Sequence, residues 1–452
     1  MTLAQRLAWL EALSTLGILG VGAVLWLGPA PNADVLWALA PRVALVAAVC
    51  LGSLYFNDLY NFELPHDFPN LFGRLCRALG VSALALAVTY VVFPATMIPG
   101  HLTSHALLTL LAVMLLIRGA VYALAKRAPF SERVLIMGAG ALALELAQQI
   151  RTRPDLALRL LGFLGETAPA TPGAPGGPTI GRYTEVEAAV RRHRADRIIV
   201  AMPDRRGRLP VEALLACRVR GVRIEEGTEV YERFTRRLAV ESLTPSALVF
   251  SDGFRVTRAR LAIKRVLSVV IAGLALAAGA PFMAFMALLI KLESPGPVFF
   301  IQERVGLRGR TFRLIKFRTM RVVDGTTGDT VIRDNMSRVT RVGAVLRRYR
   351  LDEVPQFINI LRGDMSLVGP RPEMAENVAT FTDLIPFYNL RHEVRPGLTG
   401  WAQVRAGYSM SLEEVTRKLC YDLYYIKHMS LGFDLRILFD TVKFVLCGKR
   451  PG

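Results

Sequence analysis

Four long apolar runs occupy the first 125 residues of this 452-residue chain, separated by short polar stretches. The runs cover residues 8–27, 35–55, 75–92 and 106–125. Each is close to the length of about 20 residues that an α-helix needs to cross the hydrocarbon layer of a membrane. The pattern therefore predicts a unit of four transmembrane helices over residues 1–127.

Basic residues are distributed unevenly over the segments that flank these runs. All of these basic residues lie before the first run, between the second and third runs, or after the fourth run. They are Arg6, Arg74, Arg77, Lys126 and Arg127. The other two loops, residues 28–34 and 93–104, carry no lysine or arginine. Because short basic loops stay in the cytoplasm, we expect both ends of the four-helix unit to face the cytoplasm.

Over residues 128–255 short apolar runs alternate with helical stretches, and this alternation predicts a Rossmann-like parallel sheet. The first predicted strand, residues 133–138, runs into the turn Gly138-Ala139-Gly140. Such a turn binds pyrophosphate in dinucleotide-binding folds, although a tight strand-to-helix connection alone requires the same glycines. Glu166 is the nearest candidate for the acidic residue that usually follows the second strand. Both interpretations of Gly138 and Gly140 are open.

A fifth apolar run, residues 266–290, is long enough to cross the membrane, yet both of its flanks are rich in lysine and arginine. Pro281 stands past its middle, where proline removes a backbone donor and bends a helix. A re-entrant membrane helix over residues 256–292 that breaks at Ala280-Pro281 would leave both flanks in the cytoplasm. The alternative is an ordinary transmembrane span.

Residues 293–452 form the predicted catalytic domain, which is arginine-rich and mostly α-helical, with helices expected near 339–349, 354–361 and 412–427. The fold class is therefore a membrane protein of α and α/β parts. The net charge of +19 fits anionic lipid, phosphorylated substrates or nucleic acid. We expect no nucleic acid partner, because no nucleic-acid-binding motif is present. The five cysteines are scattered and indicate free thiols.

The adjacent carboxylates Asp352 and Glu353 are the leading candidates for catalysis, and arginines surround them in the sequence. Asp352 is a good residue to begin a helix, so a purely structural cap is one interpretation. In the other, the helix dipole and nearby arginines keep Asp352 ionised, and it attacks phosphorus to form an acyl phosphate. Glu353 would then handle protons or help to hold a divalent metal.

Three basic motifs hold cations beside glycine, proline or a hydrophobic strand, which fixes the backbone for anion binding. They place Lys316, Arg318, Arg371 and Arg395 as predicted substrate-binding residues. Runs of this kind are also common on solvated faces and at lipid headgroups.

Six stretches of the last 190 residues, in this order, resemble the bacterial sugar transferase family, the monotopic polyprenyl-phosphate phosphoglycosyl transferases. They are SPGPVFF (294–300), QERVG (302–306), KFRTM (316–320), LDEVPQ (351–356), GDMSLVGPRPE (363–373) and RPGLTGWAQ (395–403). The four predicted spans and the α/β block resemble the long members of the family. The stretch LTPSALVFSDGF (243–254) is similar to the subgroup that primes exopolysaccharide synthesis.

The resemblance implies that Asp352 and Glu353 are the catalytic dyad, with Mg²⁺ bound at Asp352. It implies transfer of a hexose 1-phosphate from a UDP-hexose to undecaprenyl phosphate through a phosphosugar on Asp352, with release of UMP. It further implies a re-entrant helix in the bacterial inner membrane, a cytoplasmic catalytic domain and a possible homodimer. The family commonly has Ser-Pro at the helix break, where this chain has Ala280-Pro281.

Two other functions are compatible with parts of the chain. A membrane-tethered NAD-dependent dehydrogenase or epimerase would use the Gly138 turn, but would leave the arginine-rich C-terminal block unexplained. A non-catalytic scaffold for polysaccharide assembly would use neither carboxylate for chemistry.

Overall fold

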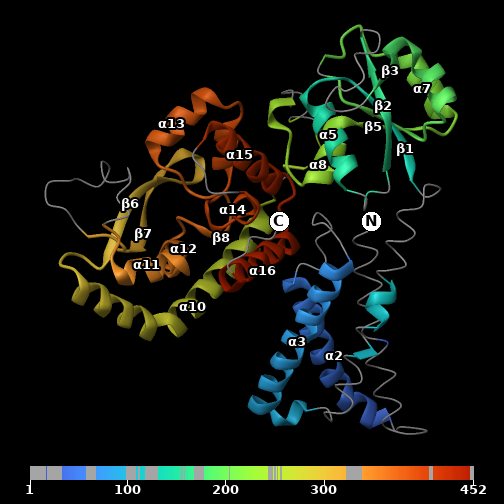
Figure 1. Ribbon diagram of the computed structural model, residues 1–452. Coiled ribbons are helices and arrows are strands. Elements are labelled where there is room, and N and C mark those ends of the chain that lie inside the picture. Colours follow the sequence, from blue (N-terminus) through green and yellow to red (C-terminus); the bar gives the residue numbers. More distant parts are fainter. Residues whose placement is uncertain are drawn as a thin grey trace. The chain divides into compact units, whose positions relative to one another are not determined.

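A computed structural model describes residues 33–57, 68–97, 112–117, 131–153, 158–166, 178–202, 204–242, 257–321, 338–406 and 411–447, with a few isolated positions. The chain divides into two compact units, Met1–Val230 and Tyr231–Pro451, here called the N-terminal and C-terminal units. The element order is shown along the ribbon in Figure 1.

Two apolar helices of the N-terminal unit pack against each other, α2 (Ala33–Phe56) and α3 (Phe68–Val92). Cys50 and Leu54 of α2 share a buried cluster with Leu75 and Leu86 of α3. These helices contain the predicted spans 35–55 and 75–92. The first predicted span lies outside the described residues but for one position, and of the fourth only 108–109 and 112–117 are described, as helix.

A five-stranded parallel sheet of order β3-β2-β1-β4-β5 forms the rest of the N-terminal unit, as predicted. Its strands are β1 (Glu132–Met137), β2 (Leu158–Gly165), β3 (Thr179–Arg182), β4 (Arg197–Val200) and β5 (Arg223–Glu226). Its helices are α5 (Ala141–Thr152), α6 (Val186–His193) and α7 (Val211–Val219). Helix α8 (Gly227–Thr235) follows β5 and contains the boundary between the two units.

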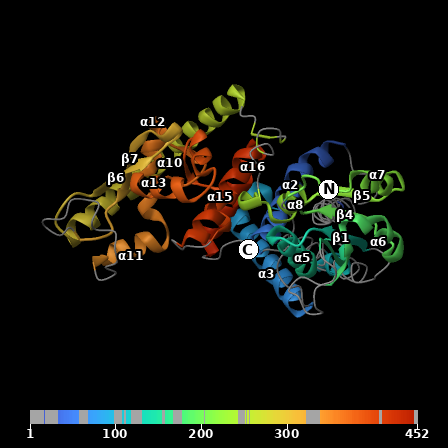
Figure 2. The same ribbon diagram turned by 90° about the horizontal axis from the view of Figure 1, so that it is seen from above.

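Helices cover both faces of this sheet, which is why its strands are continuously apolar. Leu135 and Met137 of β1 face the buried side chains of α6 and α7. The intervening β1 residues Val134 and Ile136 are also fully buried. Figures 1 and 2 place α5 and α7 on opposite sides of the sheet. The strand order reverses between β1 and β4, the place where open α/β sheets bind ligands.

The C-terminal unit joins one long apolar helix to a mostly helical domain with two small sheets. The long helix is α10 (Arg258–Glu293), and β6 (Phe299–Val305) pairs with β7 (Thr311–Phe317) in an antiparallel hairpin. The short strands β8 (Ser366–Val368) and β9 (Gly397–Thr399) are parallel. The other helices are α11 (Arg341–Arg348), α12 (Gln356–Arg362), α13 (Ala375–Leu384), α14 (Trp401–Arg405), α15 (Leu412–Lys427) and α16 (Leu431–Cys447).

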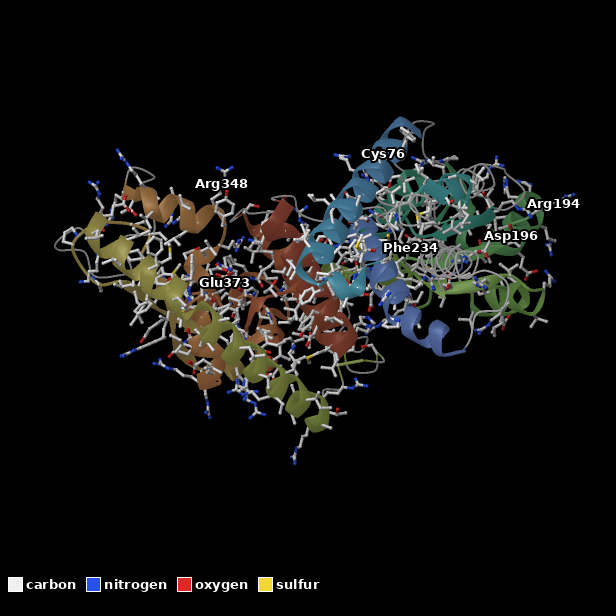
Figure 3. All side chains as sticks on the ribbon, turned by 90° about the horizontal axis from the view of Figure 1, so that it is seen from below. Cys76, Arg194, Asp196, Phe234, Arg348 and Glu373 are labelled. Carbon is white, nitrogen blue, oxygen red and sulfur yellow. The ribbon has the colours of Figure 1, made fainter. Side chains whose placement is uncertain are left out.

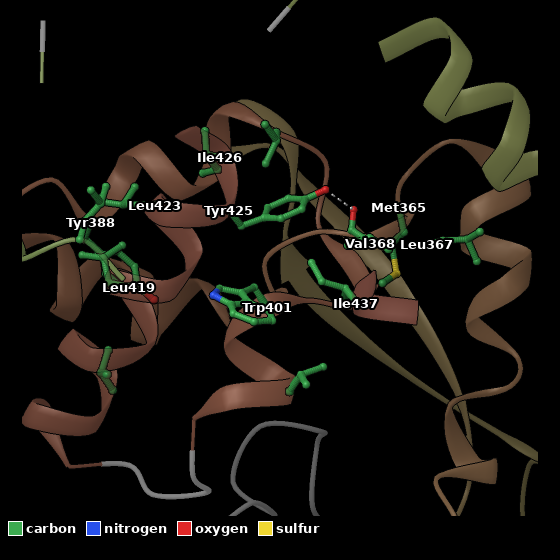
Figure 4. Packing of buried hydrophobic residues seen from close by; sticks show 14 of the residues in the cluster. Met365, Leu367, Val368, Tyr388, Trp401, Leu419, Leu423, Tyr425, Ile426 and Ile437 are labelled. Atoms are coloured by element: carbon green, nitrogen blue, oxygen red, sulfur yellow. Dashed lines mark hydrogen bonds between the residues drawn. The ribbon is translucent and has the colours of Figure 1, made fainter. Parts of the chain in front are cut away.

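The core of the C-terminal unit surrounds Trp401 and Tyr425, which Figure 4 shows among aliphatic side chains. The Trp401 indole donates a hydrogen bond to the Arg236 carbonyl over 2.9 Å, and the Leu238 amide donates to the Cys420 carbonyl over 3.0 Å. Residues 231–242 therefore pack into the C-terminal unit, although the sequence pattern predicts them within the Rossmann-like domain. They contact residues far along the chain, and a domain boundary placed from local sequence composition does not reveal such contacts.

The apolar run 266–290 lies within α10, which continues through Pro281 as one helix. Figure 1 shows its ribbon changing direction part way along. The predicted break at Ala280-Pro281 is thus a proline inside a continuous helix, and the re-entrant path remains a prediction. By length and composition α10 and the segment Phe72–Val92 are the two described helices that could cross a membrane.

Candidate active site

The Asp352-Glu353 pair lies on a short 3₁₀ turn, η8 (Leu351–Glu353), between α11 and α12. Arg350 enters this turn in the left-handed region with φ 57°, a conformation that is strained for a residue other than glycine. The expectation that Asp352 begins the next helix is wrong. Pro355 is the residue before α12, and Asp352 belongs to the tighter turn upstream.

Arginines hold Glu353 in the interior. Its Oε1 atom accepts from Arg371 Nη2 over 2.9 Å, and Arg350 Nη1 lies 3.6 Å away. Burial acts to raise the pKa of Glu353, but Arg371, Lys316 and Arg350 together outweigh it and lower that pKa. Glu353 is therefore an ionised carboxylate whose oxygen contacts arginine side chains.

Asp352 has the opposite environment although it is the neighbouring residue. It is half-buried and makes no ion pair or hydrogen bond with another side chain among the described residues. Burial, followed by repulsion from Glu353, raises its pKa, and Lys316 and Arg347 only partly offset this. The surrounding cations do not lower the pKa of Asp352 below its ordinary value, because Glu353 takes the closest arginine. Asp352 is therefore a more basic carboxylate than Glu353, and it has no side-chain partner among the described residues.

Lys316, near the end of β7, brings a cation to both carboxylates. Burial, helped by the neighbouring Arg371 charge, lowers its pKa to about 8. Glu353 and Asp352 act in the other direction on the same pKa, which places the ammonium group near both of them. Lys316 and Arg371 were both predicted from their motifs, and the structure brings them together with the dyad.

Arg304 and Glu373 extend the site and were not predicted. Arg304 Nη1 lies 3.8 Å from Glu373 Oε2, and its Nη2 donates to Gln302 Oε1 over 2.7 Å. Figure 3 shows Glu373 among the inner side chains of the unit, whereas Arg348 of α11 projects outward. Both residues lie in stretches that carry the family resemblance, QERVG and GPRPE, so the motifs themselves were the available signal.

The main chain around Arg371 is fixed by close packing. The Gly369 amide donates to the Thr399 carbonyl over 2.8 Å, and a Cβ at Gly369 would lie 2.4 Å from the Arg395 carbonyl oxygen. The Arg371 carbonyl accepts from Arg391 Nη2 over 3.0 Å. These contacts aim the Arg371 side chain at Glu353.

Arg318 and Arg395, predicted to bind substrate, lie with other partners. The buried Arg318 guanidinium donates to main-chain oxygens at the end of α10, including the Ser294 carbonyl over 2.7 Å. Arg395 Nε donates to the Gly363 carbonyl over 3.0 Å, next to Arg265 at the end of α12. Neither arginine is among the leading charges that shift the pKa of Asp352 or Glu353. Substrate binding by Arg318 and Arg395 remains a prediction. Strand β7 ends at Phe317, and the Arg318 side chain turns to the end of α10.

The Gly138 turn is explained by packing. Gly138 has φ 132°, and a Cβ there would lie 2.3 Å from the carbonyl oxygen of Ala201 after β4. Gly140 precedes α5 in an extended conformation that any residue adopts. Glu166 forms an ion pair with Arg208 over 2.5 Å. The glycine requirement therefore follows from the approach of two strand ends, and no nucleotide contact is needed to account for it.

Oxygen donors for a divalent cation are few. Within the described residues no group of three histidine, cysteine or acidic side chains could hold a metal. Mg²⁺ uses one or two carboxylates and completes its shell with water and substrate phosphates. Asp352, whose carboxylate pairs with no other described side chain, fits that donor set, whereas the Glu353 oxygen is engaged by arginines.

Comparisons with known proteins identify the family to which the chain belongs. A model of bacterial sugar transferases matches residues 259–448, and a model of a CoA-binding domain matches residues 56–225. The UDP-N-acetylgalactosamine-undecaprenyl-phosphate N-acetylgalactosaminephosphotransferase of Aeromonas hydrophila is 49% identical over 186 residues, 41% of this chain and 44% of that protein. The UDP-glucose:undecaprenyl-phosphate glucose-1-phosphate transferase of Escherichia coli K12 is 44% identical over 182 residues, 40% of this chain and 39% of that protein.

The exopolysaccharide production protein PSS of Rhizobium leguminosarum bv. phaseoli is 42% identical over 188 residues, 40% of this chain and 94% of that protein. The chain thus spans less than half the length of the Aeromonas and Escherichia relatives and nearly all of the Rhizobium protein. The family match 259–448 contains the dyad, Lys316, Arg371, Arg304 and Glu373. The chain belongs to the bacterial sugar transferase family.

Proposed function

We propose that this protein transfers a hexose 1-phosphate from a UDP-hexose to undecaprenyl phosphate, as the priming step of exopolysaccharide synthesis. The names of the relatives support the donor and acceptor classes. The observation that carries the proposal is the contrast within the dyad. Glu353 is held by two arginines, while Asp352 has a raised pKa and no side-chain ion pair among the described residues.

Asp352 is the nucleophile in this proposal. A carboxylate oxygen attacks the β-phosphorus of the UDP-hexose, and the bond from that phosphorus to the bridging oxygen breaks, so that UMP leaves. The hexose phosphate remains on Asp352 as an acyl phosphate. A phosphate oxygen of undecaprenyl phosphate then attacks the same phosphorus, which frees Asp352 and forms the lipid diphosphosugar.

Positive charge at the site opposes the repulsion between a carboxylate and a diphosphate. Lys316 and Arg371 lie beside the dyad and supply part of it. Asp352 is the residue that would hold Mg²⁺ together with substrate oxygens, and bound Mg²⁺ would supply further positive charge to the phosphates.

Glu353 has a positioning role in this proposal instead of the proton transfer expected from the sequence. Its lowered pKa makes it a weak base, and its oxygen is engaged by Arg371 and Arg350. Attack by an ionised carboxylate on a diphosphate requires no proton to be removed from the nucleophile. Glu353 therefore keeps the two guanidinium groups in place beside Asp352.

The membrane setting belongs to the same proposal. Two apolar helices and the lipid acceptors of the relatives support a membrane protein. We propose a multi-pass protein of the bacterial inner membrane, with α10 re-entrant and the catalytic unit facing the cytoplasm in contact with the bilayer. The homodimer implied by the family resemblance remains a prediction.

The test is an assay of the purified full-length protein with undecaprenyl phosphate and a series of UDP-hexoses, in the presence and absence of Mg²⁺. The proposal expects UMP and a lipid diphosphosugar from at least one donor. Release of UDP would indicate an ordinary glycosyltransferase, and the absence of any nucleotide product would support the scaffold alternative. A dehydrogenase or epimerase would require tight dinucleotide binding, which the packed Gly138 turn does not favour.

A further inference from the structure

The end of the membrane helix α10 is held by the buried side chain of Arg318. Arg318 is 5% exposed, and its guanidinium donates to the Ser294 carbonyl over 2.7 Å and the Ser294 hydroxyl over 3.0 Å. It also donates to the Pro295 carbonyl, with a longer contact of 3.4 Å to the Ile290 carbonyl. A cation at a helix C-terminus satisfies carbonyls that have no partner within the helix and interacts favourably with the helix dipole.

The last residue of α10 extends this connection to α11. Glu293 Oε1 accepts from the Arg341 amide over 2.6 Å, and Oε2 accepts from the Val342 amide over 2.9 Å. A carboxylate that accepts two amides at a helix N-terminus fixes the start of that helix. Helix α11 leads directly to Arg350 and the turn that carries the dyad.

Contacts of Thr319, the residue after Arg318, also hold α11. The Thr340 amide donates to the Thr319 carbonyl over 3.1 Å, and Arg347 Nε donates to Thr319 Oγ1 over 2.8 Å. Gly343 of α11 passes so close that a Cβ there would lie 2.1 Å from the Thr319 carbonyl oxygen. Residues 318–319 therefore contact both the end of α10 and the helix before the dyad.

An apolar cluster fills the space between these polar contacts. Ile290 of α10, Phe317 of β7 and Leu346 of α11 form its buried centre. Leu351 and Val354, on either side of the dyad, pack against the same cluster. Displacement of the end of α10 would therefore be transmitted through close-packed side chains to Asp352 and Glu353.

The other end of the dyad segment is also attached to α10. Arg265, before Pro281 in this helix, donates to the Ile360 carbonyl over 2.5 Å and to the Leu361 carbonyl over 2.9 Å at the end of α12. The segment from Leu351 to Arg362 is thus held at its start by the part of α10 after Pro281 and at its end by the part before it.

We propose that Arg318 and Glu293 are positioning residues that set the Asp352-Glu353 turn relative to the end of the membrane helix. The proposal rests on the transferase function proposed above. It assigns Arg318 no substrate contact, since its guanidinium is buried against protein oxygens. Loss of either residue lets the end of α10 and the start of α11 shift, which misplaces Asp352 without removing any group that binds the donor.

The test compares kcat and KM for the UDP-hexose, with purified full-length protein in bilayer discs containing undecaprenyl phosphate. Arg318→Met removes the guanidinium, and Arg313→Met, at an exposed position of the preceding strand β7, is the matched control. We expect Arg318→Met to lower kcat about a hundredfold with KM changed less than about threefold, because misplacement of reacting atoms by about 1 Å has effects of this size. The control should keep wild-type values of both.

A milder second variant covers the case in which Arg318→Met does not fold. Glu293→Gln keeps the shape of the side chain but has one acceptor oxygen where the carboxylate uses two, so it should lower kcat about tenfold, again with little change in KM. Because both residues act at one junction, the double variant should lose less than the product of the two single losses.

Each result bears on a different claim. A raised KM with wild-type kcat in Arg318→Met would overturn the positioning role and restore substrate binding by Arg318. Wild-type kcat in a folded Arg318→Met, or in Glu293→Gln, would also overturn it. Failure of the wild-type protein to release UMP would instead count against the proposed function, independently of these variants.

Discussion

Two turns of this protein, the Gly138 turn and the dyad turn, were candidate sites for phosphate binding or phosphate chemistry in the sequence, and the structure explains them differently. Gly138 connects β1 to α5 with a left-handed φ, and its missing side chain leaves room for the Ala201 carbonyl. Arg350 connects α11 to the dyad turn, also with a positive φ, but it carries a long cationic side chain that lies 3.6 Å from Glu353. The Gly138 turn is explained by close packing of the main chain, whereas the Arg350 turn brings a cation close to Glu353.

The comparison teaches that a positive φ points to chemistry only through the contacts around it, because Arg194, Arg236 and Arg308 also have positive φ outside the dyad turn. A glycine at positive φ is sterically free there, so its presence needs only a close neighbour. An arginine at positive φ is strained, and the surrounding structure must hold it there. Around Arg350 the contacts that do so involve the ionised groups of the candidate site, whereas around Gly138 they involve the main chain of the adjacent strand end.

The largest expected effect is at the nucleophile. Asp352→Asn keeps the shape of the residue but removes the attacking oxygen charge, so UMP release should fall on the order of 10⁴-fold or more. The measurement is Mg²⁺-dependent UMP release from the UDP-hexose that the wild-type protein uses. Asp383→Asn, an exposed aspartate on α13, is the matched control and should retain full activity. Near-normal turnover by Asp352→Asn would show that Asp352 is not the nucleophile. The dyad turn would then have no demonstrated chemical role that distinguishes it from the Gly138 turn.

The next effect should be at the cation that holds Glu353. Arg371→Gln leaves the buried carboxylate without its 2.9 Å partner and removes a charge from the site. We expect kcat/KM for the UDP-hexose to fall about a hundredfold, the usual loss when a donor to developing negative charge is removed. Steady-state kinetics of UMP release measure it, and a change below about twofold would show that the reaction does not need the Arg371 contact with Glu353.

A substitution at Gly138 should affect stability and leave the chemistry intact. Gly138→Ala introduces a Cβ 2.3 Å from the Ala201 carbonyl at a φ of 132°, so we expect a loss of about 2 kcal/mol or more in folding stability. Gly207→Ala is the matched control, because Gly207 also has positive φ but nothing lies within 4 Å of the added Cβ. Thermal unfolding should show the smaller loss for the control.

The same two variants test the role of the glycine turn in function. UMP release per folded molecule should be the same for Gly138→Ala and the wild-type protein. A selective loss of turnover in Gly138→Ala at temperatures where it is fully folded would give the Rossmann-like domain a part in the reaction and contradict a purely packing role for this turn.

The smallest expected effect is the pH dependence due to Lys316. Its pKa of about 8 makes the side chain cationic below that pH and neutral above it. If the cation is needed for the diphosphate, kcat/KM should fall as pH rises through about 8, approaching tenfold per pH unit. Lys316→Arg should move this fall to higher pH, because arginine stays charged. A fall at the same pH in both proteins would assign the titration to another group.

Some of this site could be predicted from the sequence because its motifs are compact. Asp352 and Glu353 are adjacent, and the motifs of Lys316 and Arg371 resemble those of a known family. The apolar run of residues 133–138 and the alternation of apolar runs with helical stretches over residues 128–255 likewise predicted the parallel sheet. In each case the signal is local and has a period or an order that can be read along the chain.

The remaining parts depend on contacts between distant residues. Arg318 lies two residues after Lys316, yet it contacts the end of α10 because β7 ends at Phe317. Arg395 has a similar motif to Arg371 but donates to the end of α12. The opposite pKa shifts of Asp352 and Glu353 depend on which carboxylate the arginines reach. No pattern of residue types along the chain encodes these choices.

The central claim is that Asp352 becomes covalently bonded to the phosphorus of the sugar phosphate. The most direct measurement is mass spectrometry of the protein after incubation with the UDP-hexose and Mg²⁺ in the absence of undecaprenyl phosphate. We predict an added hexose phosphate on the peptide that contains Asp352, its loss when the lipid is supplied, and no adduct on Asp352→Asn. Steady formation of lipid diphosphosugar with no such adduct would contradict the claim.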